Sequence, residues 1–424
     1  MSTAVVLFTR DLRVRDNPAL AAARKADRVV PLFVFDRAML AETAHRHPNR
    51  FGFLCQSLID LDSSLRDRGA SLVVRRGDWV QEVLQVAYEA RATTVHVARD
   101  VSAYAQRRLA RLTEDAARSG VEVVAHDSIA VVPPTTFGKP YLVFTPYYKR
   151  WLTTDWGKLA PLPRALSMPK GLESELIPDQ SPPAEWVGGE TEALARLKAW
   201  TAASLARYAD IHDDPGADET SRMSPYLHFG CVSPREVASR LVDREGGAPF
   251  VRQVCWRDFY TQLLAWRPET SRADVRANAA PQWVDDPEVL AAWKEGRTGY
   301  PLVDAGMRQL RAEGWMHNRV RMVTASFLTK DLRIDWRVGA AHFMQLLVDG
   351  DVANNQLNWQ WVAGTGTDAN PHRVLNPTVQ AKRFDPNAVY IRRWVEEYDT
   401  DAYPAPIVDH AEAIAAWRAT RAGS

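Results

Sequence analysis

The sequence predicts a two-part protein, with a doubly wound parallel α/β sheet at the N-terminus and an all-helical C-terminal part. In the first part, short β-branched runs alternate with helix-like segments, the pattern of a parallel sheet covered by helices. Beyond Thr191, apolar residues recur at helical spacing. Of the 15 tryptophans, only Trp79 lies before residue 150. We expect domains at residues 1–130 and 191–424, joined by a linker at residues 131–190.

Five apolar strands and four intervening helices support the α/β prediction. The strands are expected at Ala4–Phe8, Val29–Phe35, Ser71–Val74, Val95–Ala98 and Val121–Ala125. The helices are expected at Pro18–Lys25, Arg50–Arg68, Trp79–Ala90 and Tyr104–Arg118. No GxGxxG motif follows the first strand, so a nicotinamide or flavin dinucleotide on this sheet is not expected.

Charged residues follow the ends of the predicted strands, where parallel sheets bind their ligands. They are Arg10, Asp11, Asp36, Arg99 and Asp100. Two interpretations stay open, because these side chains suit a small polar ligand and suit loop capping about equally well.

The middle of the chain combines an irregular segment with helix-start signals. Residues 132–187 are Pro-rich and form the linker. Ser233, Pro234 and Glu236 mark a helix start by capping chemistry. The hydroxyls of Thr220–Ser224 precede another helix and suit a phosphate. Ordinary N-capping is the preferred interpretation of this short pattern taken alone.

The densest group of unusual residues lies between Trp315 and Trp361 and includes four tryptophans. One helix here should bury Met316, Val320, Val323 and Phe327. The same helix should place Asn318, Arg321, Met322 and Ala325 on a different face, which borders solvent or a polar ligand. After it, the carboxylates of Asp349 and Asp351 flank a glycine turn, where they accept hydrogen bonds from a ligand or cap a helix.

The composition of the chain limits the classes of protein to which it can belong. The formal net charge is +1, so binding to DNA requires a local basic face. The three cysteines have no CxxC spacing, which argues against a disulfide framework and a zinc site and favours a reducing compartment. The N-terminus reads as a buried strand, not as a signal sequence, and no apolar run reaches membrane-spanning length. We expect a cytoplasmic protein without a metal site.

Several long motifs resemble the DNA photolyase/cryptochrome family. They are ETSRMSPYLHFGCVSPRE, WRDFY, GYPLVDAGMRQLRAEGWMHNRVRMVTASFLTKDLRIDW and LVDGDVANNQLNWQWVAGTGTDANPHRVLNP. The N-terminal VVLFTRDLRVRDNPAL and the region Val389–Trp394 match too, so the resemblance spans essentially the whole chain. The sequence is identified as a member of this family, closest to the class I cyclobutane pyrimidine dimer photolyases.

The resemblance implies an α/β antenna domain and a helical domain that holds FAD in a folded, U-shaped conformation. One group of matching residues would grip the FAD phosphates: Tyr208, Thr220, Ser221, Arg222, Met223 and Ser224. A second group would contact the isoalloxazine and ribose: Arg321, Asp349, Asp351 and Asn355. Asn318 matches the asparagine that faces the reactive ring nitrogen of the flavin.

The resemblance also implies light-driven DNA repair. A fully reduced flavin anion absorbs blue light, donates an electron to a flipped-out pyrimidine dimer, and recovers it after the ring splits. Matching residues of the dimer pocket and its DNA surroundings are Trp256, Arg257, Arg319, Met322 and Trp361. A chain for electron hopping from flavin to surface is matched by Trp359, Trp336 and Trp283. Without the resemblance, these three tryptophans would be interpreted as core packing.

A second chromophore is expected in the N-terminal domain. Arg50 and Asp100, within VARDVSAY, resemble the sites of 8-hydroxy-5-deazaflavin-binding members more than those of folate-binding members. Together with Arg10 and Asp36 they form the expected antenna site. Methenyltetrahydrofolate, FMN and the absence of any antenna are the alternatives.

One departure from the family pattern leaves the substrate class open. Many cyclobutane-dimer photolyases carry a glutamate at the position of Gln253, and glutamine cannot deliver a proton at neutral pH. Some (6-4) photolyases carry a glutamine there, but they also carry two histidines where Asn318 and Met322 stand. Plant photosensors place aspartate and animal ones commonly cysteine at Asn318, and sensors tend to have a longer C-terminal extension.

Local charge gives weak support to DNA as the partner. Between Arg308 and Arg337, seven basic residues against three acidic ones give +4, although a solvated helix face is a common alternative. We expect a monomeric cyclobutane pyrimidine dimer photolyase that acts on UV-damaged DNA without an obligate protein partner or a membrane. A (6-4) photolyase and a cryptochrome-type blue-light photosensor are the alternatives, and a thermally driven flavin oxidoreductase lacks a nicotinamide motif.

Overall fold

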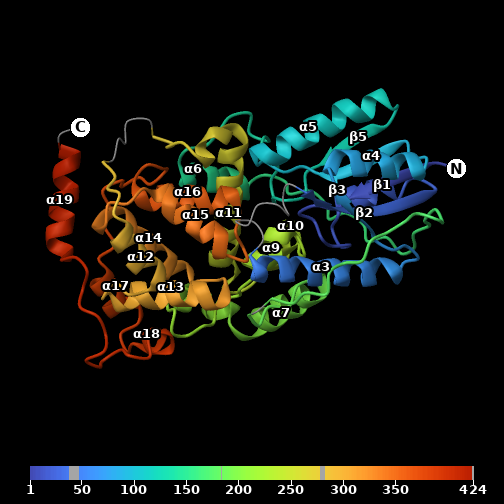
Figure 1. Ribbon diagram of the computed structural model, residues 1–424. Coiled ribbons are helices and arrows are strands. Elements are labelled where there is room, and N and C mark those ends of the chain that lie inside the picture. The colour runs from blue at the N-terminus through green and yellow to red at the C-terminus, as the bar shows by residue number, and fades with distance from the viewer. Residues whose placement is uncertain (38–46, 183, 277–281, 423–424) are drawn as a thin grey trace. The chain divides into compact units, whose positions relative to one another are not determined.

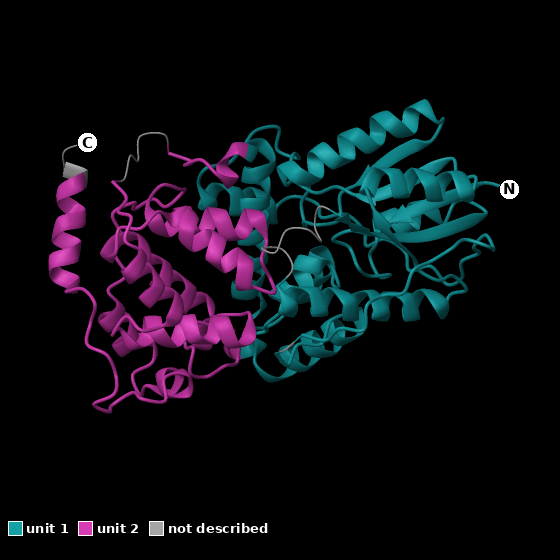
Figure 2. Ribbon diagram, viewed as in Figure 1, with its two compact units in different colours: residues 1–206, 221–268 teal, residues 207–220, 269–424 magenta. Residues whose placement is uncertain are grey.

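The computed structural model describes residues 1–37, 47–182, 184–276 and 282–422. The chain divides into two compact units (Figure 2). Unit 1 consists of Met1–Ala206 and Ser221–Pro268, and unit 2 consists of Arg207–Thr220 and Glu269–Ser424. This division follows compactness, so the functional boundaries expected at residues 130 and 190 stay a prediction.

Unit 1 contains a five-stranded parallel sheet with the order β3-β2-β1-β4-β5. The strands are β1 (Thr3–Leu7), β2 (Arg28–Asp36), β3 (Val73–Gly77), β4 (Thr94–Ala98) and β5 (Glu122–His126). Val5 in the central strand pairs with Val30 on one side and Val95 on the other. The predicted doubly wound α/β fold is confirmed, because chain order reverses across β1.

Helices cover both faces of this sheet. They are α1 (Pro18–Ala23), α3 (Pro48–Arg66), α4 (Trp79–Glu89) and α5 (Ala103–Arg118). Figure 1 shows α4 and α5 on one face and α3 on the opposite face. Asp78 and Ser102 cap α4 and α5 through their side chains, which fixes where each helix begins after its strand.

The segment predicted to be an irregular linker contains one helix, α6 (Phe144–Leu152). Here the prediction was wrong, because Pro146 near the helix start and the lack of a capping side chain at Val143 hide the helix signal. Phe144, Tyr147 and Trp151 recur at helical spacing and are buried. Residue 183 of this segment lies outside the described residues.

The remaining part of unit 1 is helical. Its helices are α7 (Glu190–Ala203), α9 (Ser224–Phe229), α10 (Pro234–Leu241) and α11 (Gly247–Trp266). The predicted start of α10 is confirmed, since the Ser233 Oγ accepts a hydrogen bond from the Glu236 N–H at 3.2 Å.

Unit 2 consists of helices and connecting loops, with no strand among its described residues. Its helices are α8 (Tyr208–Ile211), α12 (Pro287–Glu295), α13 (Pro301–Glu313), α14 (Asn318–Ser326), the π-helix η4 (Phe327–Asp331), α15 (Trp336–Leu346), α16 (Val352–Ala363), α17 (Pro377–Phe384), α18 (Val389–Trp394) and α19 (His410–Ala422). The expected apolar face of α14 is buried, and it includes Val320 and Val323. Ala325 was placed on the polar face, which was wrong, because it is also buried in this core.

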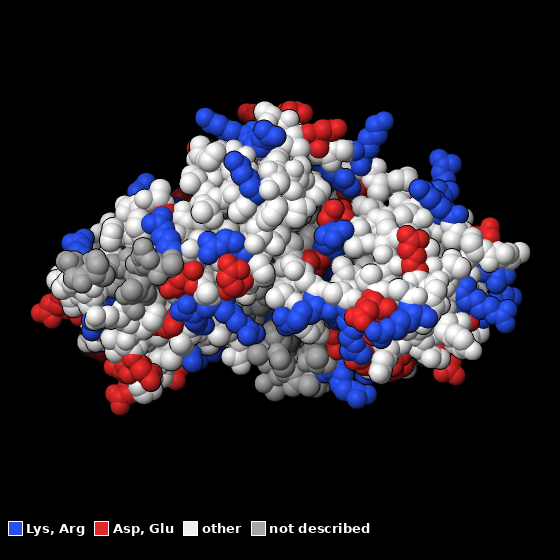
Figure 3. All heavy atoms as spheres, turned by 90° about the horizontal axis from the view of Figure 1, so that it is seen from above, with Lys and Arg blue, Asp and Glu red and all other residues white. Residues whose placement is uncertain are grey.

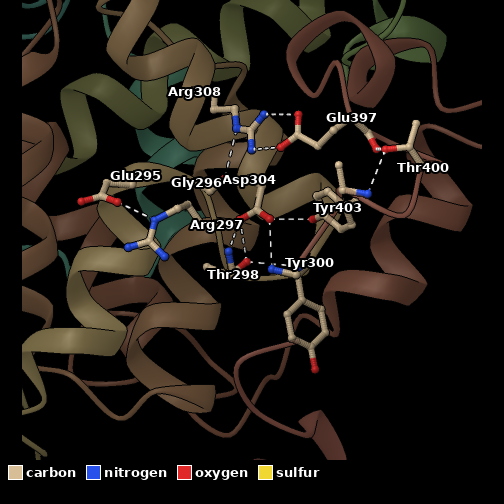
Figure 4. Close-up of polar contacts among 12 residues, drawn as sticks. Glu295, Gly296, Arg297, Thr298, Tyr300, Asp304, Arg308, Glu397, Thr400 and Tyr403 are labelled. Carbon is tan, nitrogen blue, oxygen red and sulfur yellow. Dashed lines mark hydrogen bonds and ion pairs between the residues drawn. The ribbon is translucent and has the colours of Figure 1, made fainter. Parts of the chain in front are cut away.

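A buried carboxylate fixes the start of α13 (Figure 4). Asp304 accepts hydrogen bonds from the Thr298 N–H and hydroxyl at 2.7 and 2.6 Å, and from the Gly299 N–H at 3.1 Å. The Tyr403 hydroxyl adds a fourth at 2.6 Å. Burial raises the pKa of Asp304 and these donors oppose that shift, so the cluster is a satisfied structural anchor. Among the described residues, no helix is long and apolar enough to cross a membrane.

Candidate functional site

The centre of the candidate site in unit 2 is an ion pair between α14 and the turn before α16. The Arg321 guanidinium contacts both carboxylate oxygens of Asp349, at 3.2 and 2.9 Å, and its Nε donates to the Met316 carbonyl at 2.7 Å. Asp349 is 7% exposed and Arg321 is half-buried. This fork-to-fork geometry holds a positive and a negative group in fixed orientation, as recognition of a polar ring requires.

The second predicted carboxylate caps a helix. The Asp351 Oδ1 accepts hydrogen bonds from the backbone N–H and the side-chain amide of Asn354, at 2.8 and 2.7 Å. One residue further on, the Asn355 side-chain amide donates to the Ala340 carbonyl at 3.0 Å, which joins α16 to α15. Asp349, Asp351 and Asn355 therefore lie together around the start of α16.

The turn before α14 is held by a buried polar network. The Gln309 Oε1 accepts hydrogen bonds from the Tyr390 hydroxyl at 2.6 Å and from the His317 N–H at 3.4 Å. The His317 Nδ1 accepts from the Arg319 N–H and caps α14. Burial lowers the pKa of His317 to about 4, so the ring is neutral at neutral pH and its Nε2 carries the proton. Asn318, the first residue of α14, is exposed.

The three tryptophans expected to carry electrons differ in burial. Trp359 is 3% exposed and packs edge-to-face on Phe343 with ring centroids 4.9 Å apart. Trp336 is fully buried, and its Nε1 donates to Asp274 at 2.8 Å. Trp283 is half-buried at the edge of the same core. Trp336 and Trp359 belong to one core cluster, and Trp283 packs against it. Trp336 is the most buried of the three and Trp283 the least, so the order of hopping stays a prediction.

The expected phosphate-gripping segment is divided between the two units. In unit 2, Tyr208 is 8% exposed and packs edge-to-face on His212, and burial raises the pKa of its hydroxyl. Thr220 is the last residue of this segment that belongs to unit 2. In unit 1, residues 221–224 lead into α9, and Arg222 adopts the left-handed φ of 49°. A non-glycine residue in this conformation is uncommon and often marks a functional site.

In unit 1, Trp256 belongs to an aromatic stack that the sequence did not reveal. Its ring lies parallel to Phe144 of α6, with centroids 3.6 Å apart and 3° between planes. Tyr148 stacks on Phe144 at 5.6 Å, and the Arg252 guanidinium lies 5.5 Å from the Phe144 ring. Gln253, next to Arg252, is exposed. The spacing of Phe144, Tyr147 and Trp151 is the signal that could have identified α6.

The other expected DNA-contacting residues have structural partners. In unit 1, the Arg257 guanidinium donates to the carbonyls of Ile129 and Leu227. In unit 2, Arg319 pairs with Asp213 through two contacts of 3.2 and 2.5 Å and lies over the Phe384 ring.

The last two expected pocket residues belong to unit 2. Met322 accepts a long hydrogen bond from the Asn318 amide at 3.9 Å. Trp361 is half-buried under the Arg373 guanidinium, whose carbon lies 5.3 Å from the ring.

The +4 region between Arg308 and Arg337 is not an open basic face. Arg308 pairs with Glu397, Arg337 pairs with Asp274, and Lys330 is 1% exposed. Arg319 and Arg321 are also paired. Four of the seven cations are therefore paired with acids from outside this region, so the count of +4 along the sequence overstates the free positive charge here. Figure 3 shows basic and acidic side chains interspersed on one face of the molecule.

The expected antenna residues lie at neighbouring strand ends in unit 1. The Arg10 guanidinium contacts Asp100 at 3.0 Å and the His228 carbonyl at 3.2 Å. Asp36, the last residue of β2, is 7% exposed and contacts Arg108 at 3.3 Å. Arg50 is 8% exposed within α3.

Two family models match the chain, and together they cover most of it. DNA photolyase matches residues 4–167, and the FAD binding domain of DNA photolyase matches residues 250–400. A deoxyribodipyrimidine photo-lyase of Streptomyces griseus is 48% identical, covering 99% of both chains. The Escherichia coli protein of the same name is 35% identical and covers 100% of both.

Solved structures agree with these matches. A bacterial class III photolyase from Agrobacterium tumefaciens has a TM-score of 0.91 and 34% identity, covering 100% of this chain and 98% of its own. A Synechocystis cryptochrome also has a TM-score of 0.91, with 29% identity and 99% coverage of each chain. The chain belongs to the DNA photolyase/cryptochrome family.

Proposed function

We propose that this chain repairs cyclobutane pyrimidine dimers in DNA with blue light, as a deoxyribodipyrimidine photolyase. The observation that carries this proposal is the 48% identity, over nearly the whole of both chains, to a protein named for this activity. The fold alone does not distinguish repair from sensing, because a photolyase and a cryptochrome match it with the same TM-score.

The donor and acceptor set of unit 2 fits a flavin. A flavin ring presents carbonyl oxygens and ring nitrogens that accept hydrogen bonds and an N–H that donates one, so it suits a site that offers both donors and an acceptor. The Arg321–Asp349 pair offers both in one rigid unit. The Thr220 Oγ1 and the His317 Nε2 are buried and have no hydrogen-bond partner among the described residues, as atoms that face a ligand would.

In this proposal, reduced FAD supplies the light-driven electron, and the protein holds and tunes it. Asp349, Asp351 and Asn355 contact the isoalloxazine and ribose. The Asn318 amide oxygen would accept a hydrogen bond from the N–H of the reactive ring nitrogen in the reduced flavin, and Arg321 would add positive charge that favours the reduced anion. Tyr208, Thr220 and residues 221–224 hold the phosphates with hydroxyl and backbone N–H donors.

Reduction of the resting cofactor uses the tryptophans. In this proposal the electron moves inward from Trp283 through Trp336 to Trp359. Their place in or against one core cluster, with Trp283 the most exposed, supports this path, and the hydrogen bond of the Trp336 Nε1 to Asp274 helps to stabilise the ring when it is oxidised.

From the family resemblance we assign Trp256 and Trp361 to the lesion pocket as aromatic walls, together with Met322. The parallel stack of Phe144 on Trp256 keeps that wall rigid. Arg257 and Arg319 are engaged within their own units, so we assign them a role in orienting the pocket backbone. Gln253 is exposed and offers the dimer hydrogen bonds without a transferable proton.

An antenna chromophore at Arg10, Asp36, Arg50 and Asp100 completes the proposal. We assign 8-hydroxy-5-deazaflavin to this site, with methenyltetrahydrofolate, FMN or no antenna as the alternatives. A Sulfolobus tokodaii photolyase with 30% identity holds two FAD molecules, one implicated as its light-harvesting cofactor.

We also propose that the protein is a monomer that acts on UV-damaged DNA without an obligate protein partner. We place it in the cytoplasm, where its three buried free thiols stay reduced.

The deciding experiment uses a short DNA duplex with one thymine cyclobutane dimer. Pre-reduced, FAD-loaded protein is mixed with it under blue light and in darkness, and restored thymines are counted. Restoration only in light supports the proposal. If nothing is restored while bound FAD can be photoreduced, the proposed substrate is wrong. The same assay with a (6-4) lesion, and then a test for photosensing, would follow.

A further inference from the structure

A partly exposed tyrosine beside the antenna residues is fixed in place by a buried carboxylate. Tyr104 lies in the first turn of α5 and is 44% exposed. Its hydroxyl donates a hydrogen bond to Asp36, which is 7% exposed at the end of β2. The same Asp36 oxygen contacts the Arg108 guanidinium at 3.3 Å. The carboxylate therefore holds two side chains of α5 at once.

Arg108 adds a second restraint by stacking. Its guanidinium carbon lies 3.9 Å from the centre of the Trp79 ring and 5.2 Å from that of the Tyr104 ring. Cation–π contacts at these distances are favourable and hold the guanidinium against both rings. Asp36, Tyr104, Arg108 and Trp79 thus form one polar-aromatic cluster that joins β2, α4 and α5.

This cluster lies at the ligand-binding edge of the sheet. β1 pairs with β2 on one side and with β4 on the other, so Asp36 and Asp100 follow strands that flank the same central strand. Asp100 contacts Arg10 and also accepts a hydrogen bond from the Ser102 N–H at 2.8 Å. Ser102 caps α5, and Tyr104 follows two residues later. The turn at residues 100–102 therefore positions both the Arg10–Asp100 pair and Tyr104.

Holding an exposed aromatic side chain in one rotamer costs conformational entropy, which the contacts with Asp36 and Arg108 offset here before any ligand binds. Tyr88 of α4 is the contrasting case, with 80% exposure and a role as an ordinary surface residue. Burial and the bond to Asp36 raise the pKa of Tyr104 to about 12, so its hydroxyl stays a donor at any working pH. A ring fixed in advance binds a flat ligand with less entropy loss.

We propose that Tyr104, held by Asp36 and Arg108, is the stacking platform of the antenna site and selects a planar heteroaromatic chromophore. The proposal rests on the antenna site assigned above and names a residue that contacts its ligand. Arg10 and Asp100 supply polar contacts, and the tyrosine ring supplies one apolar face.

The rival explanation is that Tyr104 and Arg108 serve only to attach α5 to the sheet. Both explanations predict that loss of the side chain lowers stability. They differ in the affinity of the folded protein for a flat ligand. They also differ for Tyr104→Phe, which keeps the ring and removes the bond to Asp36.

The experiment titrates FAD-loaded protein, freed of any antenna pigment, with FMN and separately with 8-hydroxy-5-deazariboflavin, and follows probe fluorescence. The variants are Tyr104→Ala, Tyr104→Phe and the matched control Tyr88→Ala. Arg10→Ala tests the antenna site itself. We expect Tyr104→Ala to weaken binding by about tenfold, since loss of a stacked aromatic ring has this order of effect. Tyr104→Phe should lose less, and Tyr88→Ala should bind like the parent protein. Far-UV circular dichroism confirms that each variant is folded.

The outcomes separate the two proposals. If Arg10→Ala abolishes binding while Tyr104→Ala binds normally, the platform is refuted and the antenna site stands. If the parent protein binds neither probe, the antenna assignment fails and the platform fails with it. Loss in Tyr104→Ala with normal binding by Tyr88→Ala supports the platform.

Discussion

Helix α15 packs closely against Trp359, the first tryptophan of the proposed electron path, and Gly339 makes this close contact possible. A Cβ at this position would lie 2.3 Å from the Trp359 Cη2 and 2.5 Å from the Leu328 Cδ2. Carbon atoms in contact prefer about 3.5–4.0 Å, so Gly339→Ala forces the indole or the helix to move by roughly 1 Å.

Two effects of opposite sign set the magnitude for this variant. Alanine in a helix interior gains about 1 kcal/mol over glycine. Overpacking a core costs about 1–3 kcal/mol. We expect a net loss of about 1 kcal/mol in the free energy of unfolding. Photoreduction of FAD should also slow, because the displaced Trp359 is the first electron donor in the proposed path.

Urea unfolding, followed by far-UV circular dichroism, measures the free energy of unfolding, and absorbance under blue light with an external reductant measures photoreduction. Ala341→Gly is the matched control, since Ala341 is exposed in the same helix. It should lose about 1 kcal/mol by propensity alone and photoreduce normally. A Gly339→Ala protein that is about 1 kcal/mol more stable and photoreduces at the parent rate would refute the packing argument.

Further predictions concern the flavin, the lesion and pH. Trp336→Phe should slow photoreduction at least tenfold but leave repair by pre-reduced protein nearly intact; equal loss of both would remove Trp336 from the electron path. Asn318→Asp should lower the yield of stable reduced flavin on illumination, because a negative charge beside it disfavours the anion, and an unchanged yield would contradict the role of Asn318. Gln253→Glu should raise the repair yield per absorbed photon up to severalfold, and an unchanged yield would show that no proton is needed there. The hydrogen bond to Asp331 raises the pKa of His410 above its ordinary 6.5, so docking of α19 should be strongest below about pH 6.5 and weaken as pH rises through the raised pKa. Hydrogen exchange of residues 410–422 measures this, and the same pH dependence in His410→Ala would exclude that histidine.

The sheet and most helices of unit 1 could be predicted because their signals are local. Strand β1 was expected at Ala4–Phe8 and lies at Thr3–Leu7, and helix α4 was expected at Trp79–Ala90 and lies at Trp79–Glu89. In both, a run of apolar residues at one period is bounded by a capping or turn residue. Helix α6 escaped prediction because its aromatic residues are buried by α11, a segment about 100 positions away.

The predicted site residues show the same limit. Motifs placed Arg321 and Asp349 in one site, and the structure joins them in an ion pair. The sequence could not show that Arg319 pairs with Asp213, because ion pairs between distant segments leave no periodic trace. Tyr104 was also missed as a candidate, since its significance depends on Asp36, 68 positions earlier.

The ion pairing of basic residues between Arg308 and Arg337 changes how DNA binding must be explained. A count of cations along the sequence assumes that each one faces solvent, but Arg308, Arg319 and Arg337 are paired with acids of other segments. Such pairs contribute little long-range field, so they cannot supply the counterion release that drives affinity for phosphate. DNA contact in unit 1 is better sought at cations that the structure exposes, such as Arg252. There an aromatic stack joins Phe144 to Trp256, and Arg252 lies over the Phe144 ring, so in the proposed function phosphate attraction and lesion stacking would come from neighbouring side chains.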